Sequence, residues 1–159
     1  MEEKKILVLL RQMFAGEIKN VSTTLGDDVL VIDKEALLPL VKFLNNKPHE
    51  YNMLLDLTCV DYMGEEPRFE MVYHLFSLSQ NKRIRIKARL REKDLSIASL
   101  TTIWKNANWL EREIFDLFGV HFEGHPDLRR IFMYDGFEGN PLRKDYPLRK
   151  RQPRIRLRK

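Results

Sequence analysis

The chain has 159 residues and a formal net charge of +5, a length that favours one domain with a modest hydrophobic core. Its single cysteine, Cys59, excludes an internal disulfide and an iron–sulfur cluster held by cysteines of this chain alone. No apolar run is long enough for a transmembrane helix and the acidic N-terminus lacks a signal-peptide pattern, so we expect the chain in the cytosol or on the cytosolic side of a membrane.

The first ninety residues show helical and then strand-like hydrophobic patterns. Apolar side chains recur every three to four residues up to Gly16, and two β-branched runs then flank a turn at Leu25-Gly26. The last strand-like segment alternates cations with apolar residues, so we expect one face in the core and the other, with its four cations, in solvent. In chain order, we expect a helix over about 3–15, strands over 18–23 and 29–32, a helix that Asp33 caps and that ends near Pro48, and strands over 51–61, 68–77 and 82–90.

Two further helices are expected after these strands. Asp94 can open a short helix toward Trp104, and Asn108 can cap a longer one. Glu111 would close a capping box three residues after Asn108, and Gly119 would end this helix in a left-handed conformation. The order helix, two strands, helix, three strands, helices predicts an α+β fold, a two-layer domain with helices on one face of a mixed sheet of about five strands.

The residues after Gly119 contain too many turn-forming pairs for regular elements, yet they keep large apolar side chains, among them Phe122, Leu128, Ile131, Phe132, Met133, Tyr134, Phe137 and Tyr146. Ordering about forty residues costs roughly 40 to 80 kcal/mol of backbone entropy, more than a small domain has spare surface to offset. We therefore expect a domain over 1–118 and an extended partner-binding arm over 119–159, shaped by a neighbour's surface. Nine residues between Arg143 and Lys159 are basic and one is acidic, so the arm ends in a basic tail and the rest of the chain sums to −3.

Five short segments between residues 111 and 147 carry a family resemblance. They are, in order, Glu111-Arg112-Glu113, Asp116-Leu117-Phe118-Gly119, Gly124-His125-Pro126, Leu128-Arg129-Arg130-Ile131 and Pro141-Leu142-Arg143-Lys144-Asp145-Tyr146-Pro147. This order resembles the C-subunit family, of the 30-kDa type, of respiratory NADH:quinone oxidoreductase, complex I. Related chains serve in chloroplast-type, coenzyme F420-linked and membrane-bound hydrogenase complexes, so the electron donor stays open.

The resemblance implies a non-catalytic structural subunit in the hydrophilic arm of a membrane-bound, proton-translocating complex, peripheral on the cytoplasmic side of the cell (inner) membrane. In that family the protein holds no cofactor and docks against the quinone-site D subunit, near the B and I subunits, while the complex uses NADH, FMN, iron–sulfur clusters and quinone. The alternative is the same scaffold role in a hydrogenase or F420-linked complex. The matching positions imply a partner interface made of Glu111, Arg112, Glu113, Asp116, His125, Arg129, Arg130, Pro141, Leu142, Arg143, Lys144 and Asp145.

Direct chemistry by the same residues has less support. Glu113 and Asp116 share a helix face, but Glu111 lies in the first turn, where backbone N–H groups and the helix dipole stabilise its charge. His121 and His125 have the spacing of a helical zinc pair, yet glycine and proline exclude a helix there. We expect no catalytic, cofactor-binding or metal site, and we interpret His125-Pro126 as a turn whose ring fixes the path of the arm.

Nucleic-acid binding through the basic tail is the rival function from another class. Such a tail would bind phosphate backbones weakly and with a strong salt dependence. The chain outside the tail is acidic, however, and contains no helix-turn-helix pattern or aromatic-basic RNA motif. We therefore expect no nucleic-acid partner.

Overall fold

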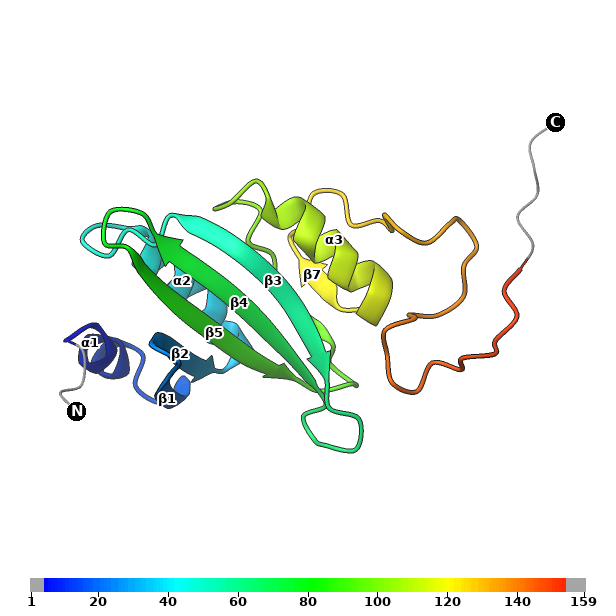
Figure 1. Cartoon of the computed structure of the whole chain (residues 1–159), viewed down its shortest axis with the longest axis horizontal. Coiled ribbons are helices and arrows are strands. Elements are labelled where there is room, and N and C mark those ends of the chain that lie inside the picture. Colours follow the sequence, from blue (N-terminus) through cyan, green and yellow to red (C-terminus); the bar gives the residue numbers. More distant parts are fainter. Residues whose placement is uncertain (1–4, 154–159) are drawn as a thin grey trace.

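The computed structural model describes residues 5–153, which form a sheet with helices packed on it and a long C-terminal arm at one side (Figure 1). The part of the predicted basic tail beyond Pro153 lies outside the described residues. In chain order the elements are α1 (Lys5–Met13), β1 (Ile18–Thr24), β2 (Asp27–Ile32), the 3-10 helix η1 (Lys34–Ala36), α2 (Leu37–Asn45), β3 (Met53–Asp61), β4 (Phe69–Ser77), β5 (Lys82–Leu90), β6 (Ser96–Ala98), α3 (Ala107–Phe118) and β7 (His121–Glu123).

The main sheet confirms the predicted α+β fold. Its five strands have the order β1-β2-β5-β4-β3, with β2 and β5 parallel and all other neighbours antiparallel. Alternate residues of β4 and β5, such as Tyr73 and Ile86, are fully buried in the core on the side that α2 covers. The cations of β5 occupy the intervening positions and keep some exposure, as their alternation predicts.

The predicted helix between Asp94 and Trp104 is wrong. The segment contains β6. This strand pairs in parallel with β7, which follows α3 in the sequence. Asp94 is instead held by Lys34, whose Nζ lies 2.5 Å from its carboxylate. Because β7 follows Gly119 and its Phe122 is only 1% exposed, the folded body extends past residue 118 to the end of β7. Phe122 therefore belongs to the core of this chain and not to a neighbour's surface.

Helix α3 begins before the predicted position and lacks the predicted capping box. Its N-cap is Asn106, which makes no side-chain capping bond, and Glu111 points into the interior. Gly119 ends the helix at a φ of 81°, as predicted. A Cβ atom at Gly119 would lie 2.7 Å from Oδ1 of Asn140, so the C-terminal arm, residues 124–153, passes directly over the end of α3.

Candidate partner interface

Asp116 holds one turn of the arm against α3. Its carboxylate is fully buried, and Oδ2 accepts the backbone N–H groups of Ile131, Phe132 and Met133 at 3.1, 2.8 and 2.9 Å. Oδ1 pairs with Nη1 of Arg130 at 3.1 Å. A carboxylate that accepts several backbone N–H groups fixes the path of the chain around it.

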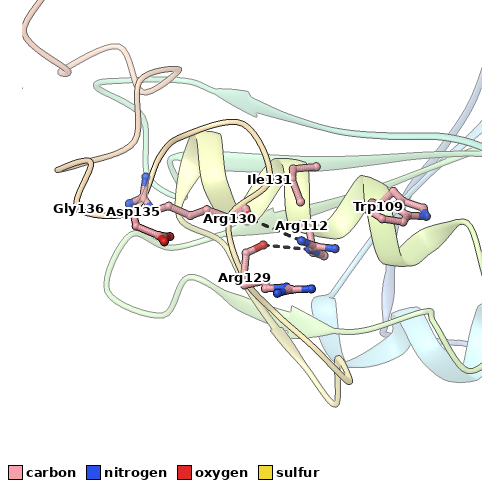
Figure 2. A pocket seen from close by; sticks show the side chains of 7 residues that line it. All are labelled: Trp109, Arg112, Arg129, Arg130, Ile131, Asp135 and Gly136. Atoms are coloured by element: carbon pink, nitrogen blue, oxygen red, sulfur yellow. Dashed lines mark hydrogen bonds between the residues drawn. The ribbon is translucent and has the colours of Figure 1, made fainter. Parts of the chain in front are cut away.

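Arg112 lies one turn earlier on α3 and holds the preceding residues of the arm. Its Nε donates to the carbonyl of Arg129 at 3.0 Å, and its Nη2 donates to the carbonyl of Arg130 at 3.4 Å. The guanidinium carbon lies 5.0 Å from the centre of the Trp109 ring (Figure 2). We call Arg112 and Asp116, with the backbone groups that they bind, the helix anchor.

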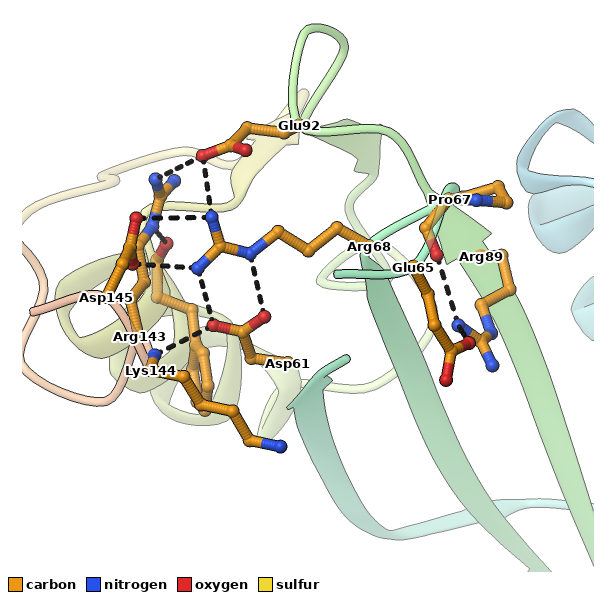
Figure 3. Close-up of polar contacts among 10 residues, drawn as sticks. Asp61, Glu65, Pro67, Arg68, Arg89, Glu92, Arg143, Lys144 and Asp145 are labelled. Carbon is orange, nitrogen blue, oxygen red and sulfur yellow. Dashed lines mark hydrogen bonds and ion pairs between the residues drawn. The ribbon is translucent and has the colours of Figure 1, made fainter. Parts of the chain in front are cut away.

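A second cluster joins the arm to the end of the sheet. Nε and Nη2 of Arg68 donate to the two carboxylate oxygens of Asp61, both at 2.8 Å, and Nη2 also donates to Asp145 at 2.7 Å. Nη1 of Arg68 pairs with Glu92 at 3.0 Å, and the backbone N–H of Lys144 donates to Asp61 at 2.8 Å (Figure 3). These five residues are called the sheet anchor.

The sheet anchor is charged at neutral pH. Its bonds to Arg68 hold the pKa of Asp61 and of Asp145 below the usual range of a carboxyl group. The carboxylates of Asp61 and Asp145 in turn raise the pKa of the Arg68 guanidinium. Arg68 is 7% exposed, so these carboxylates also compensate a cation that is largely withdrawn from water.

Between the two anchors, the arm caps the C-terminal end of α3. Asn140 Nδ2, the Leu142 N–H and Arg143 Nε donate to carbonyls of the last turn of α3 at 3.0, 3.1 and 2.7 Å. Those carbonyls have no partner within the helix, and the charge of Arg143 complements the helix dipole. We expected that the chain has too little surface to hold its own arm. For residues 140–143 this expectation is wrong, because α3 binds them.

Glu111 is a buried carboxylate behind the helix anchor. It accepts the Leu100 N–H at 2.6 Å and the Ser99 hydroxyl at 2.7 Å, and its side chain has no exposure to solvent. Burial raises the pKa of Glu111 to about 7, although both hydrogen bonds favour the ionised form. This carboxyl group therefore stabilises the loop before α3.

His125 fixes the turn at the start of the arm, as the His-Pro pair predicts. Its Nδ1 accepts the Asp127 N–H at 3.0 Å, so in the neutral ring Nε2 carries the proton and donates to the Asn108 carbonyl at 3.3 Å. Nε2 also lies 4.0 Å from the Glu111 carboxylate, and both side chains are shielded from solvent. The turn is thus joined to the first turn of α3.

Comparison with known proteins identifies the family. Residues 30–152 match the family model described as the 30 Kd subunit of respiratory-chain NADH dehydrogenase. The chain belongs to this family. The NADH-quinone oxidoreductase C subunit of Geotalea uraniireducens is 45% identical over 147 residues, which cover 92% of this chain and 89% of that protein. The resemblance seen in the sequence is thereby confirmed, and the chain is a subunit of an oxidoreductase complex of the NADH-quinone type.

A further relative and two solved structures extend the comparison. The NADH-quinone oxidoreductase C/D subunit of Azotobacter vinelandii is 43% identical over 156 residues, 93% of this chain but 26% of that protein. A trypsin-resistant fragment of Nqo5 matches with a TM-score of 0.67 and 31% identity, over 77% of this chain and 98% of the fragment. A chain of an archaeal membrane-bound sulfane sulfur reductase gives a TM-score of 0.73 over 91% of this chain and 87% of its own length; its 22% identity shows the fold alone.

Nine of the twelve residues that the family motif assigns to a partner interface gather in three places, and the other three lie outside these places. Glu113 and Pro141 are half-buried and Leu142 is exposed. The side chains of Glu111 and Asp116 are fully buried. They bind backbone groups of this chain and therefore support the surface residues without being part of the surface. The helix anchor contains or contacts Arg112, Asp116, Arg129 and Arg130; Arg143, Lys144 and Asp145 lie at the sheet anchor; Glu111, a buried residue of α3, and His125 lie beside each other.

Sequence reasoning missed Asp61, Arg68 and Asn140. Asp61 is the last residue of β3 and Arg68 directly precedes β4, so the opposite charges on either side of the turn between these strands were the sequence signal for an ion pair. Asn140 precedes a proline and reads as a turn residue, with no local sign that its side chain reaches α3. Asn140 contacts α3, and Arg68 contacts Asp145. Both contacts join residues that are far apart in the sequence.

Helix α3 and the arm expose four large apolar side chains. Trp109 is 62% exposed, Phe132 58%, Leu142 52% and Leu148 is fully exposed. We call these four residues the arm face. Exposed apolar groups of this size, when they are contiguous, mark surfaces that contact other proteins.

Two further observations concern chemistry and membranes. Within residues 5–153, no three His, Cys, Asp or Glu side chains gather in an arrangement that could hold a metal ion. Burial raises the pKa of Cys59 to about 12, which leaves its thiol protonated and unsuited to nucleophilic attack. None of the helices in this part of the chain combines the length and apolar character that crossing a bilayer requires.

Proposed function

We propose that this chain is a non-catalytic structural subunit in the hydrophilic arm of a proton-translocating NADH:quinone oxidoreductase, and that its arm face docks against the D subunit. Membership of the 30-kDa subunit family supports the complex. The relative whose name combines C and D supports the partner, because this chain corresponds to only 26% of that protein. In that relative the two subunits share one polypeptide, as suits parts that lie side by side.

The observation that carries this proposal is an apolar surface on a segment that the chain itself holds in place. Phe132 and Leu142 are more than half exposed, yet the backbone N–H of each is bonded to α3. A partner that binds such a pre-ordered segment avoids most of the entropy cost of ordering it. A trypsin-resistant fragment is known for the related Nqo5, which supports a division between a compact body and a more accessible remainder.

The non-catalytic part of the proposal is supported by the hydrogen bonds of the buried carboxylates. Asp116, Glu111 and Asp61 accept hydrogen bonds from the chain's own groups, so they are engaged in holding the structure together. NADH, FMN, iron–sulfur clusters and quinone are then assigned to other subunits of the complex. The B and I subunits are proposed as further neighbours, and attachment on the cytoplasmic side of the membrane would be peripheral and indirect. The likeness to the archaeal reductase complex concerns the fold and does not identify another electron donor.

The test is affinity purification of the whole complex from native membranes. Phe132→Asp places a charge on the arm face, so recovery of the D subunit with the tagged chain should fall at least tenfold while the melting temperature stays within a few degrees. Leu25→Asp is the matched control, because Leu25 is fully exposed in the β1–β2 turn, away from the arm. Undiminished recovery of the D subunit with the Phe132 variant would contradict the proposed docking.

A further inference from the structure

Beside the helix anchor lies an open pocket of about 510 Å³. Figure 2 shows α3 forming one side of it and the arm forming the other. Its lining combines an exposed tryptophan with three arginines and one acidic residue, namely Trp109, Arg112, Arg129, Arg130, Ile131, Asp135 and Gly136. Tryptophan and arginine are among the residue types that most often dominate the energetics of protein interfaces.

Arg112 is the unusual member of this set. It is 7% exposed, and among residues 5–153 no carboxylate lies within ion-pair distance of it. Its hydrogen-bond partners are two backbone carbonyls, which use two of the five N–H groups of a guanidinium. Arg68, equally buried, has three carboxylates around it. A buried cation without a counter-charge is costly, so Arg112 lacks the partner that Arg68 has.

The neighbouring groups favour a ligand with both charge and apolar surface. Arg129 pairs with Asp127 at 3.0 Å, but both side chains are mostly exposed, so that pair is weak and can exchange for a better partner. Trp109 presents an exposed ring next to the Arg112 guanidinium, and Ile131 adds an aliphatic wall. Arg130 is already paired with Asp116, so among the described residues Arg112 is the cation of the pocket that lacks an ion pair.

We propose that this pocket binds a carboxylate side chain of the partner protein, carried beside an apolar residue that packs on Trp109. The carboxylate would accept hydrogen bonds from the N–H groups of Arg112 that bind no carbonyl and from Arg129, since charged guanidinium groups form strong hydrogen bonds with carboxylates. This inference rests on the proposed docking and specifies its chemistry. A phospholipid headgroup would satisfy the charge but leave the ring of Trp109 and the side chain of Ile131 without an apolar partner, so a protein segment is favoured.

Photo-crosslinking in the intact complex tests the proposal. Benzoylphenylalanine replaces Trp109 in one variant and Phe132 in a second, with Leu25 as the matched control position on the opposite side of the molecule. The probe at Trp109 should crosslink to a partner peptide that contains Asp or Glu within about three residues of the attachment point, and the probe at Leu25 should not capture that peptide.

The outcomes separate the two proposals. A crosslink from the Phe132 position with none from Trp109, or a Trp109 crosslink to a peptide without an acid or to lipid, would overturn the carboxylate pocket and leave the docking in place. Failure at both positions would count against the docking itself.

A charge exchange then tests the ion pair directly. Arg129→Glu should lower recovery of the complex about tenfold or more, as expected for loss of a hydrogen-bonded charge pair. Replacing the crosslinked partner acid by Arg should restore recovery in this background. Arg83→Glu, at an exposed position of β5 that does not line the pocket, is the control and should have little effect. Absence of rescue by the partner exchange would contradict the pairing.

Discussion

Three buried carboxylates in this chain are stabilised by different means. Asp61 is paired with the Arg68 guanidinium, whereas Asp116 accepts three backbone N–H groups of the arm and pairs with Arg130. Glu111 has hydrogen bonds, but among residues 5–153 no Lys or Arg lies in ion-pair contact with it, and its pKa is raised. The consequence of neutralising each group should therefore differ in sign and in pH dependence.

Glu111→Gln tests the raised pKa. In the folded chain the pKa lies at about 7 against an ordinary value of 4.5, so folding favours the protonated form and the free energy of unfolding should fall as pH rises between those values. A shift of this size corresponds to about 3 kcal/mol lost between pH 4 and pH 8. Urea unfolding of both proteins at several pH values measures it. The glutamine variant should lack this component, while Glu113→Gln should keep it; parallel pH curves for the wild type and Glu111→Gln would contradict the assignment.

Asp116→Asn tests the helix anchor. The substitution keeps the side-chain shape but removes the charge that binds three N–H groups and Arg130. We expect a loss of roughly 2 kcal/mol in the free energy of unfolding, because hydrogen bonds to charged groups are the strong ones. Amide hydrogen exchange at residues 131–133 should accelerate by at least tenfold. The control is Asp127→Asn, at an exposed position; equal exchange in the two variants would count against the anchor.

At the scale of elements, prediction succeeded where the signal is local. Strand alternation indicated β1 to β5 within a few residues, and Gly119 was read correctly as the end of α3. It failed for β6 and β7, because their pairing joins segments on either side of α3 and neither three-residue strand has a pattern of its own. Prediction failed for the capping box because the Glu111 carboxylate accepts the Leu100 N–H in the loop before α3 and not a backbone N–H at the start of the helix. Contacts between distant segments leave no periodic trace in a sequence.

Gly119→Ala separates backbone strain from arm contact at the end of α3. An alanine would occupy a positive φ, and its Cβ would also lie 2.7 Å from Asn140 Oδ1. Gly26→Ala carries a similar φ of 89° but meets nothing within 4 Å, so it reports the strain alone, about 1 kcal/mol. We expect Gly119→Ala to lower the free energy of unfolding by at least about another 1 kcal/mol, because Asn140 must move. Chemical denaturation measures both variants, and equal losses would show that the arm does not press on Gly119.

At the scale of the whole molecule, the sequence predicted a segment that needs a surface but not which surface. The apolar residues and turns after Gly119 indicated an arm that lies on something, and the family motif marked most of the residues involved. The structure supplies part of that surface from α3 and from the end of the sheet. Arg68 and Asp145 are 77 residues apart, and no spacing rule connects them. The remaining exposed residues of the arm face are those that a partner can still cover.

Asp145→Asn tests whether the sheet anchor keeps the arm on the body. Asp145 is about half exposed, so its loss should change the melting temperature little, whereas Asp61 is buried and Asp61→Asn should lower it clearly by leaving Arg68 under-compensated. Cleavage by trypsin after Arg143 and Lys144 should become several-fold faster in Asp145→Asn at pH 7, because a protease needs the local backbone to open.

Since the pKa of Asp145 is lowered, the wild-type anchor stays charged at this pH and weakens only as pH falls through that lowered value. Asp135→Asn, on the exposed part of the arm, should be cleaved like the wild type; if Asp145→Asn is cleaved no faster than Asp135→Asn, the arm is held on the body by contacts other than the sheet anchor.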